Sequence, residues 1–290
     1  MESEKVAYEI KESDIKFEST PIGSGAFGKV YKGTLIQTGQ IIAVKKVLQD
    51  SRYKNRELSI MLELNHQNII KLVAYYYTKG KTDLYLHCVM EYMPITLSDL
   101  ILKNAKSKTQ FPPIVLKIFI FQMLRAIGYL HAIGICHRDI KPQNIMVDLN
   151  DYTLKLCDFG CAKRLVKGEE NIAYICSRHY RPPESVLGAT EYTTQTDVWS
   201  MGCVIAEVVL NETLFRGKSA KEQLAVIIKV LGTPTQEQVK VMNPRFKATL
   251  RLPQIPHKDW KQVFKGKTND ALYLDLIDKI LLLSYLFILY

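Results

Sequence analysis

The sequence predicts an α+β protein with two lobes, in which a smaller β-rich part precedes a larger α-rich part. Residues 14–86 mostly alternate or run apolar in the short segments that are typical of strands, with glycines at the turns. Residues 114–133 and 198–210 are apolar stretches of helical length. The character of the chain changes near residues 91–94, so we expect the two lobes to meet there.

Two further helices are expected at definite places. One lies over about residues 53–64, inside the β-rich part, where apolar side chains recur at helical spacing. The other covers residues 221–231 and stops at Gly232, with Pro234 two residues further on. The predicted organisation is a frayed N-terminus over 1–13, an N-lobe over 14–92, a C-lobe over 93–282 and a divergent apolar tail over 283–290.

Length, composition and charge limit the domain organisation and the partners that can be expected. The chain has 290 residues, enough for one large domain or for two lobes that share a cleft, and 47% of them are hydrophobic. The formal net charge of +10 fits either a generally solvated basic surface or a groove for phosphate and for acidic or phosphorylated substrates. Basic runs with interleaved aromatic residues are not found, so we expect no nucleic-acid partner.

The location is expected to be cytoplasmic or nuclear. The 6 cysteines form no C-x-x-C pair and show no zinc spacing, which is typical of free thiols in a reducing compartment. The N-terminal residues MESEKVAYEI lack the features of a secretory signal. Residues 280–290 are almost wholly apolar but are shorter than the about 20 residues that a membrane helix needs, so we expect no membrane partner.

Three short motifs follow one another in a fixed order. They are HRD at residues 137–139, Asn144 five residues after the aspartate, and DFG at residues 158–160. This order and spacing resemble the catalytic core of the eukaryotic protein kinases. The resemblance implies a kinase-like fold with a β-rich N-lobe and an α-rich C-lobe.

The kinase resemblance implies a separate task for each motif residue. Asp139 would accept the proton of the substrate hydroxyl, and Lys141 would steady the γ-phosphate. Asn144 and Asp158 would hold Mg²⁺ ions that bridge the phosphates of ATP. Positioning and charge neutralisation then account for most of the catalysis.

Residues 23–28 read GSGAFG, which fits G-x-G-x-x-G. Rossmann proteins use the same letters, but there the loop opens a helix. Here the residues after Gly28 alternate like a strand and turn at Gly33, so the loop is expected to join two strands, as in the kinase hairpin over ATP. Glycine lets the backbone approach the phosphates closely. A nucleotide-binding oxidoreductase is excluded on this ground.

Lys45 follows at the place expected for the phosphate-binding lysine, in the stretch AVK at residues 43–45, which resembles V-A-I-K. Lys46 should point to the opposite face of the strand, because side chains alternate. Glu57 is the expected partner of Lys45, and Glu63 on the same predicted helix is the alternative.

The resemblance places the hinge at residues 91–93, where adenine would make two backbone hydrogen bonds, and makes Met90 the residue that guards the back pocket. The expected nucleotide-binding residues are Ile22, Gly23, Gly25, Gly28, Val30, Ala43, Lys45, Met90, Glu91 and Met93.

Some polar residues near the motifs are expected to be structural. His137 and His131 have no chemistry to perform in this loop type. Asp197 is expected to be a buried anchor for the backbone of the catalytic loop, because a buried carboxylate needs N–H partners.

Several stretches resemble one branch of the kinases more closely. Residues 45–50 (KKVLQD), 54–58 (KNREL), 174–178 (YICSR) and 230–235 (VLGTPT) are similar to the glycogen synthase kinase-3, or shaggy-type, family. The resemblance covers about residues 14–282. It implies a serine/threonine kinase that prefers primed substrates, which already carry a phosphate a few residues C-terminal to the target.

The family resemblance also implies binding residues. Arg56, Arg138 and Lys163 match the three cations of the priming-phosphate pocket, and a phosphate dianion is well held by Arg forks and a Lys point charge. Tyr174 matches the activating phosphotyrosine of the activation loop, the alternative being an ordinary surface tyrosine. Residues 230–264 would form a docking groove for a scaffold helix.

The chain departs from the family after Leu282. The family continues with a loop whose arginine pairs with the glutamate of the Pro-Glu motif, here Glu184, so the C-terminal helices are expected to be truncated and Glu184 to lack its partner. The main hypothesis is an active Mg-ATP-dependent kinase. The alternative is a catalytically impaired kinase-like binding module or an unstable product.

Overall fold

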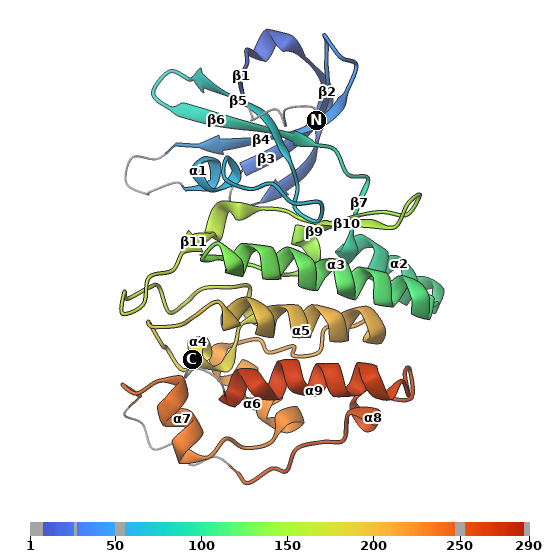
Figure 1. Cartoon of the computed structure of the whole chain (residues 1–290), viewed down its shortest axis with the longest axis vertical. Helices are drawn as coiled ribbons and strands as arrows, with labels where there is room; N and C mark the ends of the chain where they lie inside the picture. Colours follow the sequence, from blue (N-terminus) through green and yellow to red (C-terminus); the bar gives the residue numbers. More distant parts are fainter. Residues whose placement is uncertain (1–7, 26–27, 50–55, 247–252, 287–290) are drawn as a thin grey trace. The chain divides into compact units, whose positions relative to one another are not determined.

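The computed structural model describes the chain except for residues 1–7, 26–27, 50–55, 247–252 and 287–290, and of residues 282–286 it describes only the backbone. The chain divides into two compact units (Figure 1). Unit 1 comprises Met1–Ile95 and Met146–Ala162, and unit 2 comprises Thr96–Ile145 and Lys163–Tyr290. The predicted α+β fold class is confirmed, because unit 1 contains a six-stranded sheet and unit 2 is mainly helical.

The sheet of unit 1 has the strand order β1-β5-β6-β4-β3-β2. The pairing of β1 with β5 is parallel, and the other described pairs in this sheet are antiparallel. The strands are β1 (Tyr8–Glu9), β2 (Ile15–Gly25), β3 (Gly28–Leu35), β4 (Ile41–Leu48), β5 (Leu72–Lys79) and β6 (Leu84–Glu91).

The alternation of side chains along β4 sends successive residues to opposite faces of this sheet. Ile42 and Val44 are completely buried in an apolar cluster on one face, which leaves Ala43 and Lys45 for the other face. The cluster consists of Ile15, Leu35, Ile42, Val44, Ala74, Tyr76 and Val89.

The helix α1 (Glu57–Met61) follows β4 and is shorter than predicted. The prediction extended to residue 64, but the hydrogen bonds from Glu63 N to Ile60 O and from Leu64 N to Met61 O tighten the backbone into i→i+3 turns that end the helix. Residues 53–55 of the predicted helix lie outside the described residues.

The segment Met146–Ala162 belongs to unit 1 although it follows the first part of unit 2 in the sequence. It contains most of β9 (Ile145–Asp148), β10 (Thr153–Leu156) and the short 3₁₀ helix η3 (Phe159–Cys161). Asn68 Nδ2 donates to Leu154 O at 3.0 Å, and Leu156 N donates to Asn68 O at 2.9 Å. The sequence-based bounds treat 93–282 as one stretch, whereas these bonds group the DFG aspartate with the sheet of unit 1.

The chain passes from unit 1 to unit 2 within β7 (Ile95–Thr96). The predicted helices at 114–133, 198–210 and 221–231 are confirmed as α3, α5 and α6, and α6 ends at Gly232, whose φ is +86°. The helices are α2 (Leu97–Ser107), α3 (Pro113–Ala132), α4 (Pro183–Val186), α5 (Gln195–Leu210), α6 (Ala220–Leu231), α7 (Gln236–Met242), α8 (Trp260–Val263) and α9 (Ala271–Leu286). The short elements are β8 (Ile135–Cys136), η2 (Pro142–Asn144), β11 (Lys163–Arg164) and η4 (Arg178–Tyr180).

The helix α5 is the core of unit 2. Fourteen of its residues are buried, which explains why it reads as a continuous apolar run rather than as an amphipathic helix. It packs against α9, and the two helices lie side by side in Figure 1. A Cβ at Gly202 would lie 2.4 Å from Ile280 Cγ2, so this glycine allows the close approach.

Among the described helices, α3 is long and apolar enough to cross a membrane by length and composition. Its seven buried residues recur on one face at helical spacing, from Val115 to Leu130. A core helix of a water-soluble domain meets the same criterion, so the observation is weak support for a membrane span.

Glu184 in α4 has a buried carboxyl group, of which one oxygen makes no hydrogen bond with the described residues. It is 3% exposed, and its Oε2 has no hydrogen-bond partner among the described residues. Burial raises the pKa of Glu184 to about 7. The expectation that this residue lacks a partner is therefore met in the part of the chain that the structure describes.

We expect Glu184 to make unit 2 less stable as the pH rises. The folded protein holds a proton that the unfolded chain loses above its ordinary pKa of 4.5, so stability falls between pH 4.5 and about 7. The loss is about 3 kcal/mol by the linkage relation. Glu184→Gln should remove this slope and be more stable than wild type at pH 8 in urea unfolding.

The control for this measurement is Glu191→Gln, because the side chain of Glu191 is 57% exposed. Parallel pH profiles for wild type and Glu184→Gln would show that the buried carboxyl does not titrate in this range.

Candidate active-site residues in the two units

Lys45 is a buried cation of unit 1 with two carboxylate partners. Its Nζ donates to Glu57 Oε1 at 2.6 Å and to Asp158 Oδ1 at 2.7 Å, and the Lys45 side chain is only 8% exposed. Burial alone would lower the pKa of Lys45, but the carboxylates of Glu57 and Asp158 raise it, so the ammonium stays charged. Three sequence segments are thus joined by one buried charge.

The structure decides between the alternatives around Lys45. Glu57, and not Glu63, makes the described ion pair with Lys45. Lys46 faces the other side of the strand, where its Nζ lies 4.3 Å from the centre of the Tyr85 ring. The alternation predicted for the two lysines is confirmed by these different partners.

Asp158 is held in a backbone conformation that few residues adopt. Its φ is +65°, in the left-handed region, where a non-glycine residue costs about 1–3 kcal/mol. Its Oδ1 accepts from Lys45 and, at 3.4 Å, from the N–H of Gly160. The side chain is 25% exposed, so a carboxylate that the lysine holds in place also remains accessible.

Two positions of the G-x-G-x-x-G motif, Gly25 and Gly28, differ in the structural reason for having a glycine. Gly25 and Gly28 face each other across the β2–β3 pair, and residues 26–27 lie outside the described residues. Gly28 has a φ of +132°, and a Cβ there would lie 2.0 Å from Lys46 O. A Cβ at Gly25 would meet no described atom within 4 Å. The fold therefore requires Gly28, whereas Gly25 leaves space that a ligand could use.

The other predicted nucleotide-binding residues lie on neighbouring strands of the unit 1 sheet. Val30 pairs with Lys45 across β3 and β4, and Ala43 pairs with Met90 across β4 and β6. Glu91 ends β6, where its Oε1 accepts from Lys71 N at 2.7 Å and from Lys155 Nζ at 2.8 Å. The remaining ones are Ile22 and Gly23 on β2, with Ile22 51% exposed, and Met93 just after β6, 8% exposed.

Asp139 is the centre of a hydrogen-bonded cluster in unit 2. Its Oδ2 accepts from Lys141 Nζ at 2.6 Å and from Asn144 Nδ2 at 3.2 Å, and its Oδ1 accepts from Ser177 Oγ at 2.8 Å and from Ser177 N at 3.1 Å. Lys141 Nζ also donates to Ser177 Oγ at 3.2 Å. These contacts fix the carboxylate in one orientation.

Ser177 is a site residue that sequence reasoning missed: it lies in the stretch YICSR at 174–178, but no role was predicted for it. The signal that could have found it is its place seven residues before Glu184 of the Pro-Glu motif, next to the cation-rich stretch at 178–181. Its hydroxyl donates to a carboxylate oxygen of Asp139, which is the bond that a substrate hydroxyl would make.

Asp197 anchors the backbone of the catalytic loop, as predicted. It is completely buried, and its two carboxylate oxygens accept from His137 N at 2.7 Å and from Arg138 N at 2.8 Å. Burial alone would raise the pKa of Asp197, but hydrogen bonding to His131 and the nearby imidazoles hold it below its usual value. Arg138 adopts a φ of +65°, and the anchor supports this strained conformation.

Asn144 and Asp158 fit the oxygen-ligand chemistry of Mg²⁺. Asn144 Nδ2 donates to Asp139 O at 2.8 Å, so the amide nitrogen is used within unit 2 and the amide oxygen is the atom left for a cation. Asp158 offers its carboxylate in unit 1. Among the described residues no group of three or more His, Cys, Asp or Glu side chains could hold a metal ion.

The predicted phosphate-binding cations are all described. Arg56 caps α1 in unit 1, while Arg138 and Lys163 belong to unit 2. Arg138 Nη1 donates to the hydroxyl of Tyr192 at 3.2 Å. Lys163 Nζ donates to Asn171 Oδ1 at 2.6 Å and to Glu169 Oε1 at 2.9 Å.

Tyr174 is 62% exposed and lies in a cationic setting. The guanidinium of Arg181 stands 3.6 Å from the centre of its ring. Hydrogen bonding to Arg181 and then to Arg178 lowers the pKa of Tyr174 to about 8. An accessible hydroxyl beside two arginines is a suitable place for a phosphate.

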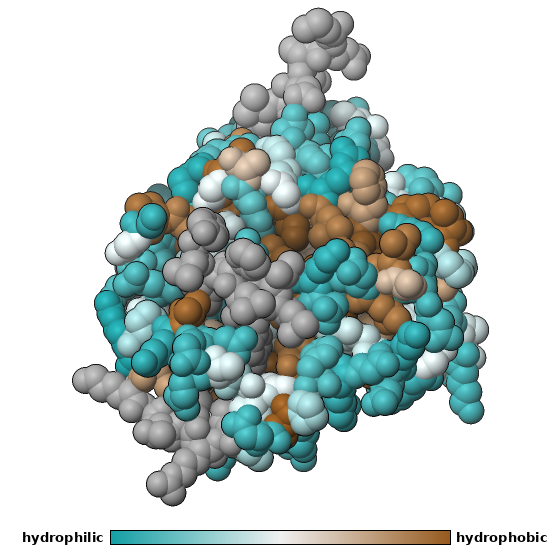
Figure 2. Space-filling model, turned by 60° about the horizontal axis from the view of Figure 1, so that its bottom comes forward, coloured by the Kyte–Doolittle hydropathy of each residue, from teal (hydrophilic) through white to brown (hydrophobic). Residues whose placement is uncertain are grey.

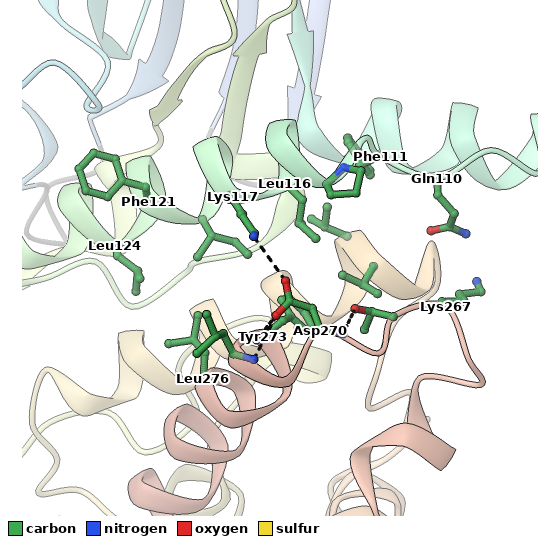
Figure 3. A pocket seen from close by; sticks show the side chains of 16 residues that line it. Gln110, Phe111, Leu116, Lys117, Phe121, Leu124, Lys267, Asp270, Tyr273 and Leu276 are labelled. Atoms are coloured by element: carbon green, nitrogen blue, oxygen red, sulfur yellow. Dashed lines mark hydrogen bonds and ion pairs between the residues drawn. The ribbon is translucent and has the colours of Figure 1, made fainter.

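A pocket of about 450 Å³ lies elsewhere in unit 2, between α3, the end of α5 and the start of α9 (Figure 3). Its lining is mainly apolar, and Lys117 forms an ion pair with Asp270 across it at 3.4 Å. Figure 2 shows that apolar side chains gather into a patch on the lower face within a mostly hydrophilic surface. The pocket contains none of the predicted site residues, so it is separate from the cluster around Asp139.

The family model described as Protein kinase domain matches residues 17–282. Because this match spans most of the chain, the protein belongs to the protein kinase family. It is a phosphotransferase of the class that uses ATP with a divalent metal ion and acts on protein substrates.

The two glycines of the loop give a first test. Gly28→Ala should lower the Tm, because the new Cβ would collide with Lys46 O. Gly25→Ala should fold normally and raise the KM for ATP about tenfold, a loss of binding of about 1.4 kcal/mol, because the methyl group occupies ligand space. Thermal unfolding and ATP titration of the kinase activity measure both effects. An unchanged KM in Gly25→Ala would remove this glycine from the nucleotide site.

Proposed function

We propose that this chain is a serine/threonine protein kinase of the glycogen synthase kinase-3 type, which transfers the γ-phosphoryl group of Mg-ATP to primed protein substrates. The observation that carries the proposal is the buried ammonium of Lys45 between Glu57 and Asp158, at 2.6 and 2.7 Å. Buried charged groups of this kind cluster at functional sites, and β4 also carries Ala43 of the predicted nucleotide site.

The chemistry at the acceptor depends on Asp139. Its carboxylate would accept the proton of the incoming Ser or Thr hydroxyl, and the bond that it now accepts from Ser177 Oγ shows that a hydroxyl can reach it. Lys141 donates to both Asp139 and Ser177, so its ammonium is positioned to neutralise charge beside the acceptor. Asp197 would keep the loop backbone in place while this happens.

Mg²⁺, when bound with ATP, supplies the positive charge that offsets the developing charge on the phosphoryl oxygens. Asp158 and Asn144 would hold the metal through their side-chain oxygens. Lys45 would orient the α- and β-phosphates, with Glu57 fixing the direction of the ammonium.

The preference for primed substrates rests on Arg56, Arg138 and Lys163. Arg138 is 6% exposed, and the side chain of Lys163 is 14% exposed, so in both the charge is largely withdrawn from water. Cationic side chains with little exposure to water bind a phosphate dianion strongly. We propose that Tyr174 is the phosphorylated tyrosine of the activation loop and that residues 230–264, in their described part, dock a scaffold helix.

One observation favours the alternative of a catalytically impaired kinase-like binding module. Oε2 of Glu184 is buried without a hydrogen-bond partner among the described residues, and an uncompensated buried carboxyl weakens the unit that carries Asp139. Transfer of phosphate to a primed peptide separates the two functions.

Lys45→Arg and Asp158→Asn should each reduce kcat for a primed peptide at least about 100-fold, because each removes a preorganised charge from the nucleotide site. Lys46→Arg is the matched control, since Lys46 contacts Tyr85 on the other face of β4. Radiolabelled phosphate transfer measures all three variants. Wild-type rates in Lys45→Arg and Asp158→Asn would refute the assignment of the site.

Arg56→Ala should lower kcat/KM for a primed peptide about tenfold or more and leave the same peptide without its priming phosphate almost unaffected. The reason is that only the phosphorylated peptide places a dianion against the arginine. Steady-state kinetics with the two peptides gives the comparison. Equal losses on both would contradict a role in priming.

A further inference from the structure

Lys163 has a carboxylate already in contact with it. Its Nζ donates to Glu169 Oε1 at 2.9 Å as well as to Asn171 Oδ1 at 2.6 Å. The Lys163 side chain is 14% exposed, whereas the Glu169 side chain is 49% exposed. A buried ammonium needs a counter-charge, and this loop supplies one when no other anion is bound.

The loop that carries Glu169 is tied to the second proposed phosphate-binding cation. Asn171 Nδ2 donates to Glu169 O at 2.9 Å, which joins the Lys163 partners into one small cluster. The hydroxyl of Tyr192 accepts from Arg138 Nη1 and donates to Ile172 O, each at 3.2 Å. The two proposed phosphate-binding cations of unit 2 are thus linked to residues 169–172, Lys163 directly and Arg138 through the hydroxyl of Tyr192. Glu169 supplies the carboxylate among these contacts.

The contact can be exchanged at low cost. A half-exposed carboxylate in a surface turn gains little from an ion pair, because water solvates it well once it swings away. Asn171, in contrast, is held by its own N–H, which donates to Thr190 O at 2.8 Å. An incoming anion would thus displace Glu169 and keep the Asn171 contact.

We propose that Glu169 is an internal competitor for Lys163, so that an anionic group of the substrate must displace its carboxylate before it can bind there. The proposal rests on the proposed binding of primed substrates by Lys163 and Arg138. The contact between Glu169 and Lys163 lowers the affinity of every incoming anion by the same factor, because only a fraction of the unliganded protein has the ammonium free. A phosphate dianion still binds Lys163 more tightly than a carboxylate does, because it carries one more negative charge.

Glu170 provides the matched control. It is adjacent in sequence and carries the same charge, but it pairs with Arg245 and not with Lys163. Glu169→Gln and Glu170→Gln therefore change the net charge equally, and only the first removes the competitor at the site.

The test uses three peptides that carry phosphoserine, glutamate or serine at the priming position. Wild type should prefer phosphoserine strongly over glutamate. Glu169→Gln should lower the KM for the phosphoserine and glutamate peptides by the same factor of about three to five and leave the KM for the serine peptide unchanged, while Glu170→Gln keeps the wild-type values.

A second readout is independent of catalysis. The dissociation constants of inorganic sulfate and of acetate are measured by NMR titration at constant ionic strength. Glu169→Gln should bind both sulfate and acetate more tightly than wild type by the same factor, and Lys163→Met should lose the response to both anions.

The outcomes separate the two proposals. Strong preference for phosphoserine in wild type, with unchanged KM values in Glu169→Gln, overturns the role of Glu169 and leaves the priming site intact. Equal use of the phosphoserine and serine peptides, with no effect of Lys163→Met on sulfate binding, overturns both. KM values that fall equally in Glu169→Gln and Glu170→Gln also overturn the proposal, because the effect is then one of net charge.

Discussion

A buried charge must find ion-pair or hydrogen-bond partners in the chain itself, because water is excluded from it. This requirement determines how the site residues of unit 1 are placed. The ammonium of Lys45 stands between Glu57 and Asp158 on three segments that the sequence keeps far apart. Removing one member of such a buried pair leaves an uncompensated charge and costs about 3–5 kcal/mol. Strand β4, helix α1 and the segment after β10 are therefore fixed to one another by the same interaction that prepares the lysine for phosphate.

The same requirement holds in unit 2, where the buried charge is negative. Asp197 is a buried anion, and the backbone N–H groups of His137 and Arg138 that satisfy it belong to the loop that carries Asp139. Lys163 differs in one respect, because its carboxylate partner is half exposed. A fully buried partner makes a permanent anchor, whereas a half-exposed partner can give way to a ligand. The exposed fraction of the partner thus distinguishes the buried contacts that stabilise the fold from the Lys163–Glu169 pair, which we propose to be exchangeable.

Glu184 shows what happens where the requirement is not met by the described part of the chain. Its buried Oε2 finds no partner there, and the carboxyl responds by holding its proton up to a pKa of about 7. The stability of unit 2, which positions Asp139, is therefore coupled to pH by a group that does not touch the reacting atoms.

The sequence by itself determined that a β-rich part precedes an α-rich part, where α3, α5 and α6 lie, and that a glycine loop joins two strands, because periodicity and spacing are local properties. It also determined the residue types at Lys45, Asp139 and Asp158. It favoured Glu57 and left Glu63 open, and only the ion pair between Lys45 and Glu57 in the folded structure decided between them. The contact of Ser177 with Asp139, the pairing of Glu169 with Lys163 and the grouping of residues 146–162 with unit 1 were decided by the tertiary structure alone. These features depend on which segments pack together and on how much water the packing leaves around each charge, and neither is written in the spacing of residues along the chain.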